Sequence, residues 1–220
     1  MAQTRRIPSA LPFTDQVALF SRLAEANPAP RTELNFLNPY TLLVAVALSA
    51  QATDTGVNRA TRELFALADT PQKMLDLGLE AVTRHIQTIG LYRQKARNVI
   101  ALSRLLVDEY GGEVPDSRAA LMGLPGVGRK TANVVLNCAF GHASQAVDTH
   151  IFRVGNRTRI APGRDVEAVE RAIEDNVPVR FQSHAHHWLI LHGRYICQAR
   201  RPRCGVCIIR DLCPYEEKTQ

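Results

Sequence analysis

One glycine-rich segment organises the rest of the chain: Leu121-Met122-Gly123-Leu124-Pro125-Gly126-Val127-Gly128-Arg129-Lys130-Thr131-Ala132-Asn133. Proline fixes φ and glycine accepts positive φ, so residues 125–128 predict a tight turn. A strongly helical run follows over residues 129–140. The turn therefore delivers the chain onto a helix N-terminus, where backbone N–H groups and the helix dipole favour an anion such as a phosphate.

The turn by itself is open to two interpretations, because glycine turns of this kind often serve only to pack one helix against another. Lys130, one step inside the helix, adds an amine that can act as a phosphate contact or as a nucleophile. Asp148 lies in the segment Val147-Asp148-Thr149-His150, just ahead of another predicted helix. Its simplest role is that of an N-cap, which also keeps a carboxylate ionised.

Composition indicates an ordinary folded protein with a basic surface. The 220 residues are 45% hydrophobic and 22% charged, with a formal net charge of +6. A positive balance favours a polyanionic partner such as nucleic acid. No apolar run approaches the ~18 residues that a membrane span needs, and no secretory signal is evident, so we expect a reducing, cytoplasmic setting.

Apolar periodicity and capping residues predict an all-α protein, with no strand-like alternation of useful length. Asn38-Pro39 predicts the start of a helix over residues 40–50 that is apolar all round and therefore buried. We expect further helices at residues 14–27, 54–67, 80–87, 95–110, 129–140, 149–159, 166–176 and 182–195, with Thr14 and Asp54 as caps. We also expect a short helix that starts at Thr70-Pro71 and another that Asp116 or Ser117 caps.

Four of the five cysteines crowd the C-terminus, at Cys197, Cys204, Cys207 and Cys213. In a reducing compartment, clustered thiols indicate a metal centre before disulfides. Zinc ribbons usually show two close pairs, whereas a single close pair with two outlying thiols suits a cubane cluster, and spacing alone leaves both open. Three arginines between the first two cysteines form a basic loop that is either solvated or in contact with phosphate: Arg200, Arg201 and Arg203.

These features together resemble the helix–hairpin–helix DNA glycosylases, and among them the endonuclease III family of glycosylase/lyases for damaged pyrimidines. The likeness extends from about residue 19 to residue 218. It includes the hairpin with Lys130, the Val147-Asp148-Thr149-His150 segment, Leu48-Ser49-Ala50-Gln51-Ala52-Thr53-Asp54, Thr88-Ile89-Gly90-Leu91-Tyr92 and the four-cysteine C-terminus.

The resemblance implies a base excision repair enzyme acting on double-stranded DNA with damaged pyrimidines or abasic sites. Lys130 would form a Schiff base with the sugar and cut the strand 3′ to the abasic site by β-elimination, with Asp148 as the second catalytic residue. Gln51 would fill the gap left by the everted nucleotide and Leu91 would press on the partner strand. His150 would contact the backbone or shape the site.

The same resemblance implies further DNA contacts at Gly126, Val127 and Gly128, a [4Fe–4S] cluster on the four cysteines, and a monomer associated with a bacterial-type nucleoid. Residues 32–142 would form a six-helix domain and residues 1–31 plus 143–220 an iron–sulfur domain, with the two flanking a cleft.

Two other classes remain open on the sequence. A monofunctional adenine or mismatch glycosylase shares the hairpin and the aspartate but lacks the lysine at position 130. A non-catalytic helix–hairpin–helix module would bind DNA and would need neither Lys130 nor Asp148.

Overall fold

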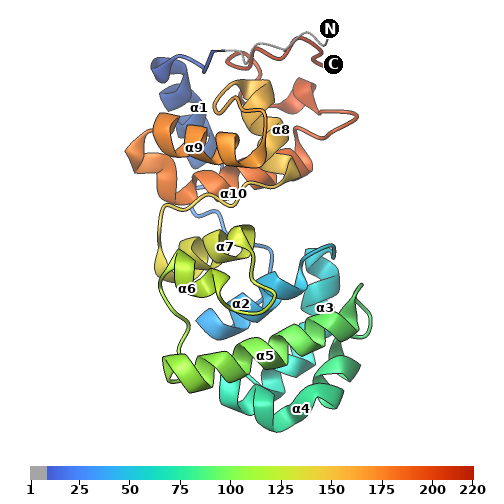
Figure 1. Cartoon of the computed structure of the whole chain (residues 1–220). Helices are drawn as coiled ribbons and strands as arrows, with labels where there is room; N and C mark the ends of the chain where they lie inside the picture. Colours follow the sequence, from blue (N-terminus) through green and yellow to red (C-terminus); the bar gives the residue numbers. More distant parts are fainter. Residues whose placement is uncertain (1–8) are drawn as a thin grey trace, which may run out of the picture. The chain divides into compact units, whose positions relative to one another are not determined.

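The computed structural model describes residues 9–220, and all regular structure in this range is helical, which confirms the predicted all-α fold (Figure 1). The elements are α1 Phe13–Ala26, α2 Pro39–Leu48, α3 Asp54–Leu67, α4 Pro71–Ile86, α5 Tyr92–Tyr110, α6 Arg118–Met122, α7 Arg129–Phe140, α8 Thr149–Thr158, α9 Val166–Asn176, α10 Val179–Tyr195 and the 3-10 turn η1 Cys204–Val206. Within residues 9–220, no helix combines the length and the apolar character that crossing a membrane requires.

The chain forms two compact units. One comprises residues 32–142 and contains α2 to α7. The other combines residues 143–220 with the described part of residues 1–31, so it contains α1 and α8 to α10.

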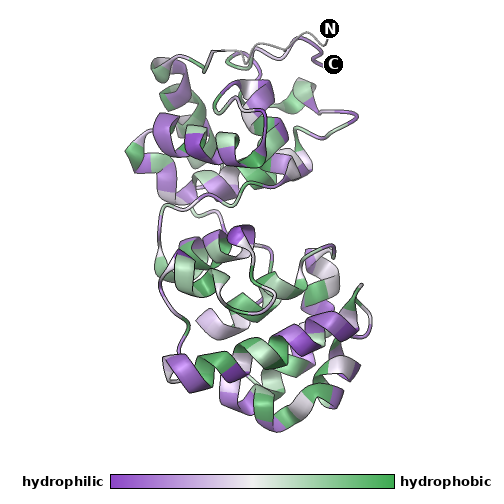
Figure 2. Ribbon diagram, in the orientation of Figure 1, coloured by the Kyte–Doolittle hydropathy of each residue, from purple (hydrophilic) through white to green (hydrophobic). Residues whose placement is uncertain are grey.

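Helix α2 is the centre of the first unit. Every residue from Tyr40 to Leu48 is buried, as expected for a helix that is apolar all round. Figure 2 colours most of this helix in the green of hydrophobic residues. It packs against α3, α5 and α7. A capping box starts it: the Asn38 side chain accepts from Thr41 N at 2.9 Å, and the Thr41 hydroxyl accepts from Asn38 N at 3.0 Å. The predicted Asn38-Pro39 start is therefore correct.

The two helices expected between residues 71 and 87 are joined in α4, but Gly78 interrupts the helix. Its φ of 81° and ψ of 164° lie outside the range open to residues with a Cβ. The segments on either side of Gly78 therefore keep the character of two short helices, and Thr70 caps the first of them through Lys73 N at 3.2 Å.

The N-terminal helix belongs to the second unit because aromatic packing and polar contacts hold it there. Phe20 on α1 stacks on Phe181 of α10 with ring centroids 5.6 Å apart. The ring centroids of Phe20 and Trp188 lie 6.3 Å apart. The indole N–H of Trp188 donates to the carbonyl of Asn27 at 2.8 Å. Arg22 donates to a carboxylate oxygen of Asp211 at 2.9 Å, so α1 also contacts the cysteine segment.

Two predicted helix caps are wrong. Thr14 lies inside α1, which begins after Pro12 with no side-chain cap. Thr53 rather than Asp54 caps α3, because the Thr53 hydroxyl accepts from Gly56 N at 3.1 Å. Ser117 occupies the N-cap position of α6, one of the two positions predicted, but its side chain makes no capping bond.

Two helices also begin earlier than predicted, α5 at Tyr92 rather than Lys95 and α10 at Val179 rather than Gln182. In both, the first turn has no side-chain cap that a pattern could have marked.

Replacing Phe20 with alanine is expected to lower the free energy of unfolding of the second unit by about 3–5 kcal/mol, because the ring is fully buried against two aromatic partners. Trp188 is the chain's single tryptophan, so its fluorescence during urea denaturation reports this unit. Phe13→Ala is the matched control: Phe13 lies on the same helix, is 64% exposed, and should change stability by less than about 0.5 kcal/mol. Equal effects of the two substitutions would contradict the packing described here.

Candidate functional site

The turn before α7 is held by a close approach between backbone and side chain. Gly126 has a φ of 80°, and a Cβ built on it would lie 2.7 Å from Asn98 Nδ2 and 3.0 Å from Asn98 Cβ on α5. The turn closes through a hydrogen bond from Val127 N to Leu124 O at 3.1 Å. Position 126 therefore requires glycine both for its backbone conformation and for the space beside α5.

The turn ends at Gly128, the N-cap of α7. Its backbone is extended, with a φ of −92° and a ψ of 175°, and no side chain caps the first turn of the helix. A Cβ on Gly128 would meet nothing within 4 Å. The N-terminal end of α7 is therefore open to an approaching ligand, as predicted for an anion site.

The residues of this turn have different environments. Gly126 and Gly128 are exposed, whereas the Val127 side chain is buried. The Val127 N–H is also used inside the turn, so this residue anchors the hairpin to the core, and its role as a DNA contact stays a prediction. Lys130 stands exposed in the first turn of α7.

Asp148 is the N-cap of α8. Its Oδ1 accepts from His150 N and from Ile151 N, both at 2.9 Å. The side chain is half-buried. Two backbone N–H groups of the first turn donate to this carboxylate, so the expected capping role is correct.

His150 follows in the first turn of α8 and is fixed by its own helix. Its Nδ1 lies 3.2 Å from Nη2 of Arg153. Since a guanidinium only donates, Nδ1 accepts and a neutral ring carries its proton on Nε2. The His150 Cβ would lie 2.9 Å from a Cβ added to Gly193, so α8 and α10 cross closely here.

Gln51 and Leu91 occupy neighbouring loops with the same unusual backbone. Gln51 has a φ of 55° and Leu91 a φ of 59°, and both are exposed. A Cβ on Gly90 would lie 4.0 Å from the carbonyl oxygen of Gln51, so the two loops lie side by side. Left-handed backbone at residues other than glycine costs about 1 kcal/mol or more each and gathers at functional sites.

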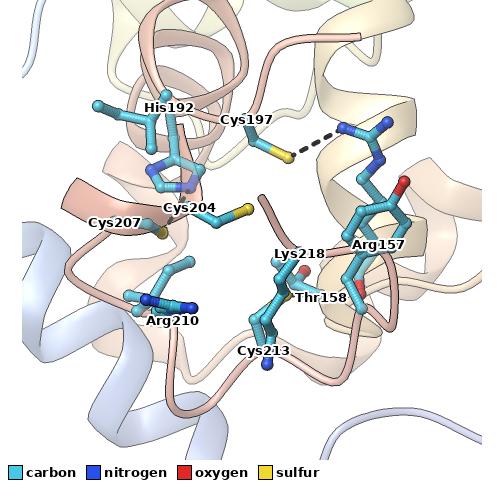
Figure 3. Close-up of a pocket in the computed structure, with 12 residues that line it drawn as sticks. Arg157, Thr158, His192, Cys197, Cys204, Cys207, Arg210, Cys213 and Lys218 are labelled. Atoms are coloured by element: carbon cyan, nitrogen blue, oxygen red, sulfur yellow. Dashed lines mark hydrogen bonds between the residues drawn. The ribbon is translucent and has the colours of Figure 1, made fainter. Parts of the chain in front are cut away.

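The four C-terminal cysteines surround one small cavity, which is also lined by Arg157, His192, Arg210 and Lys218 (Figure 3). No three His, Cys, Asp or Glu side chains within residues 9–220 are arranged to hold a single metal ion. Four thiols around a common space suit a cubane cluster, in which each iron takes one thiolate. The residues present therefore fit an iron–sulfur cluster.

Charge and hydrogen bonding around this cavity suit an anionic cluster. Arg157 Nη1 lies 3.5 Å from Cys197 Sγ, and its two terminal nitrogens each donate at 2.8 Å to a carbonyl of the following loop, that of Gln198 and that of Ala199. Its guanidinium also lies 4.5 Å from the centre of the Tyr215 ring. Arg157 therefore holds the ligand loop and brings a positive charge to the thiols.

Burial raises the pKa of the Cys207 thiol, and it also raises the pKa of the Cys213 thiol. Without a cluster these groups therefore keep their protons, so cluster binding must release protons and is favoured by higher pH.

The three arginines of the ligand loop are exposed, while Pro202 among them is buried. Arg203 N donates to Ile196 O at 2.8 Å, which fastens the loop next to α10. This loop, Arg200 to Arg203, presents its guanidinium groups to solvent as the sequence predicted. Whether they contact a ligand stays a prediction.

The sequence did not mark Asn98, Arg153 or Arg157. Asn98, a residue of α5, faces the glycine turn before α7. Arg153 Nε donates to the carbonyl of Cys197 at 2.9 Å. These contacts join residues far apart in the chain. The only sequence signal for these contacts was that Arg153 and Arg157 lie one turn apart on the helix that Asp148 caps.

Comparisons with known proteins place this geometry in context. Residues 44–179 match the family described as "HhH-GPD superfamily base excision DNA repair protein", and residues 197–213 match the "Iron-sulfur binding domain of endonuclease III". The chain is 60% identical to endonuclease III of Escherichia coli (strain K12) over 203 residues, which covers 92% of this chain and 96% of the relative. It is 58% identical to endonuclease III of Haemophilus influenzae, over 94% of this chain and 98% of the relative.

Solved structures give the same result. The fold matches that of a trapped endonuclease III–DNA covalent intermediate with a TM-score of 0.85 and 43% identity, over 93% of this chain and 96% of the other. A thermostable thymine-DNA glycosylase matches with a TM-score of 0.81 and 26% identity, over 94% and 98% of the two chains.

Gly126→Ala is expected to lower the free energy of unfolding of residues 32–142 by about 1–3 kcal/mol, because the added methyl group meets Asn98 and the backbone conformation disfavours it. Far-UV circular dichroism during urea denaturation measures the loss. Gly128→Ala, two residues on with negative φ and open space, should change stability by less than about 0.5 kcal/mol. A Gly126→Ala protein as stable as Gly128→Ala would contradict this account of the turn.

Proposed function

Because the chain belongs to the HhH-GPD superfamily of base excision DNA repair proteins, we propose that Lys130 is its nucleophile and that damaged pyrimidines in duplex DNA are its substrates. The observation that carries the assignment is the position of Lys130: an exposed amine in the first turn of α7, directly after the glycine turn. The enzyme class itself, a DNA glycosylase with lyase activity, follows from the endonuclease III relatives.

In the proposed reaction the neutral Lys130 amine attacks C1′ of the damaged nucleoside and displaces the base, which leaves with the electron pair of the glycosidic bond and takes up a proton. Ring opening gives a Schiff base between Nζ and C1′. The iminium withdraws electrons, so a C2′ proton leaves and the C3′–O bond breaks with the phosphate as leaving group. One amine thus performs base excision and strand cleavage.

Asp148 is proposed as the second catalytic residue. Two backbone N–H groups hold its carboxylate in place, and a carboxylate can accept a proton or stabilise the positive charge that develops on the sugar. The capping bonds use Oδ1, and they fix the orientation of the whole carboxylate.

We propose that the two units act as functional domains with the boundaries expected from the sequence, 32–142 and 1–31 plus 143–220. Exposed Gln51 and Leu91 on adjacent loops of the first domain are suited to enter the duplex when a nucleotide is everted. Further contacts are proposed at the N-terminal end of α7, at His150, and at Arg200, Arg201 and Arg203 of the ligand loop. The net charge of +6 supports this role.

The [4Fe–4S] cluster held by Cys197, Cys204, Cys207 and Cys213 is proposed to serve structure rather than hydrolysis. It would fix the arginine loop from both ends, because two of its ligands flank that loop. We further propose that the protein works as a monomer on the DNA of a bacterial-type nucleoid.

Lys130→Gln is expected to lower strand cleavage at abasic sites by on the order of 10³-fold or more, because no other amine takes the place of the nucleophile. It should also abolish the covalent adduct that borohydride traps between the protein and duplex DNA with an oxidised pyrimidine. Lys73→Gln is the control, since Lys73 is exposed and pairs with Asp69 at 2.7 Å. Normal trapping with Lys130→Gln would refute the assignment, because another amine would then form the Schiff base, whereas absence of trapping with the wild-type protein would favour a monofunctional or non-catalytic class.

Asp148→Asn separates charge from capping. Asparagine caps helices as well as aspartate does, so stability should change by less than about 0.5 kcal/mol, while base excision falls by about 10²-fold or more. Asp165→Asn is the matched control, because Asp165 caps α9 through Ala168 N at 2.8 Å. The role fails if single-turnover excision by Asp148→Asn equals that by Asp165→Asn.

A further inference from the structure

The side chain of Lys95 is buried, which is unusual for a lysine. It is 7% exposed on the core-facing side of α5, and its Nζ is shielded from solvent with no hydrogen-bond partner in the part of the chain that the structure describes. Burial lowers the pKa of this amine. A buried ammonium without a hydrogen-bond partner is costly unless its surroundings offset the charge.

Two contacts fix where Lys95 lies relative to α2. The Tyr40 hydroxyl near the start of α2 lies 2.6 Å from the Ser103 hydroxyl on α5. Beyond the other end of α2, the carbonyl of Gln51 approaches Gly90, just before α5. The two helices therefore run in opposite directions past each other.

The register of the two helices then places the lysine. Lys95 precedes Ser103 by about two turns on the same buried face, and Leu48 follows Tyr40 by about two turns, so Lys95 lies at the C-terminal end of α2.

The C-terminal end of α2 carries negative partial charge, and hydrogen bonds satisfy only some of its last carbonyl oxygens. Ser49 N donates to the carbonyls of Ala45 and Val46. Within residues 9–220, no backbone bond beyond the helix reaches the carbonyl oxygens of Ala47 or Leu48. A helix C-terminus with free carbonyl groups favours a cation within its last turn.

Lys95 also lies beside the two loops that carry Gln51 and Leu91. The Gln51 loop leaves directly from the end of α2, and Leu91 is the N-cap of α5, one turn before Lys95 and hydrogen-bonded to it, with Lys95 N donating to Leu91 O at 3.0 Å. Both loops hold left-handed backbone, which persists only where the surroundings enforce it.

We propose that Lys95 is a positioning residue for base eversion: its buried ammonium stabilises the carbonyl end of α2 and thereby holds the Gln51 and Leu91 loops in the conformation that enters DNA. This inference rests on the proposed role of those two loops. Because Lys95 is buried, its proposed role is exerted through the two loops and not by contact with the reacting atoms.

Charge and packing can be separated with two substitutions. Lys95→Met keeps the length and removes the charge, whereas Lys95→Arg keeps the charge and adds bulk. Excision of an oxidised pyrimidine from duplex DNA under single-turnover conditions should fall about tenfold in Lys95→Met and stay within about threefold of the wild type in Lys95→Arg. If Lys95 served packing alone, the larger arginine would be the more harmful change.

A substrate that needs no eversion provides the internal control. Cleavage at an abasic site in a single strand should stay within about twofold of the wild type in Lys95→Met, because Lys130 and Asp148 are unchanged. Adding Lys95→Met to a protein that already carries Gln51→Ala and Leu91→Ala should lower duplex excision no further, as expected if Lys95 acts through these two loops. Resistance of Lys95→Met to urea should equal or exceed that of the wild type, because a buried unpaired charge is removed.

Any of four results would overturn the inference: normal duplex excision by Lys95→Met, slower excision by Lys95→Arg than by Lys95→Met, an equal loss on single-stranded abasic DNA, or a Lys95→Met protein that unfolds. Normal duplex excision by Gln51→Ala would overturn both this inference and the proposed role of the Gln51 loop. A wild-type protein inactive on oxidised pyrimidines but active on abasic DNA would overturn only the proposed substrate, and the Lys95 variants would then be compared on duplex and single-stranded abasic sites.

Discussion

The contact between Gly126 and Asn98 is the constraint on which the site depends. Gly126 has positive φ and packs closely against α5. This packing fixes the direction in which the chain enters α7, whose first turn contains Lys130. A bulkier residue at position 126 would move the turn away from α5 and take the start of α7 with it. The location of the amine is therefore set by sterics, several residues before the lysine itself.

Electrostatics organises the other unit in a comparable way. Arg157 contacts the Cys197 sulfur and two carbonyls of the loop that follows it, while Arg153 from the same helix holds the carbonyl of Cys197. Asp148 caps that helix at its start. Helix α8 thus carries the Asp148 carboxylate at its start, and its arginines bind the loop that follows Cys197. A substitution that disturbs one of these parts is therefore expected to disturb the other.

Sequence reasoning predicted what depends on local pattern and on family motifs. The all-α class, the buried α2, the family, the enzyme class and the iron–sulfur centre are confirmed. Thr14 and Asp54 were wrong caps, because α1 begins after Pro12 without a side-chain cap and the Thr53 hydroxyl takes the capping bond of α3. Asn98 and Lys95 could not be found, since their significance arises from contacts between distant segments. The roles of Lys130 and Asp148 remain predictions.

The most direct test of the central claim is to identify the protein atom that bonds to DNA. The protein is incubated with duplex DNA containing an oxidised pyrimidine, the adduct is reduced with borohydride and digested, and the modified peptide is sequenced by mass spectrometry. A sugar remnant on Nζ of Lys130 is the predicted result. Attachment at another lysine or at the N-terminal amine, or no covalent adduct despite base release, would contradict it.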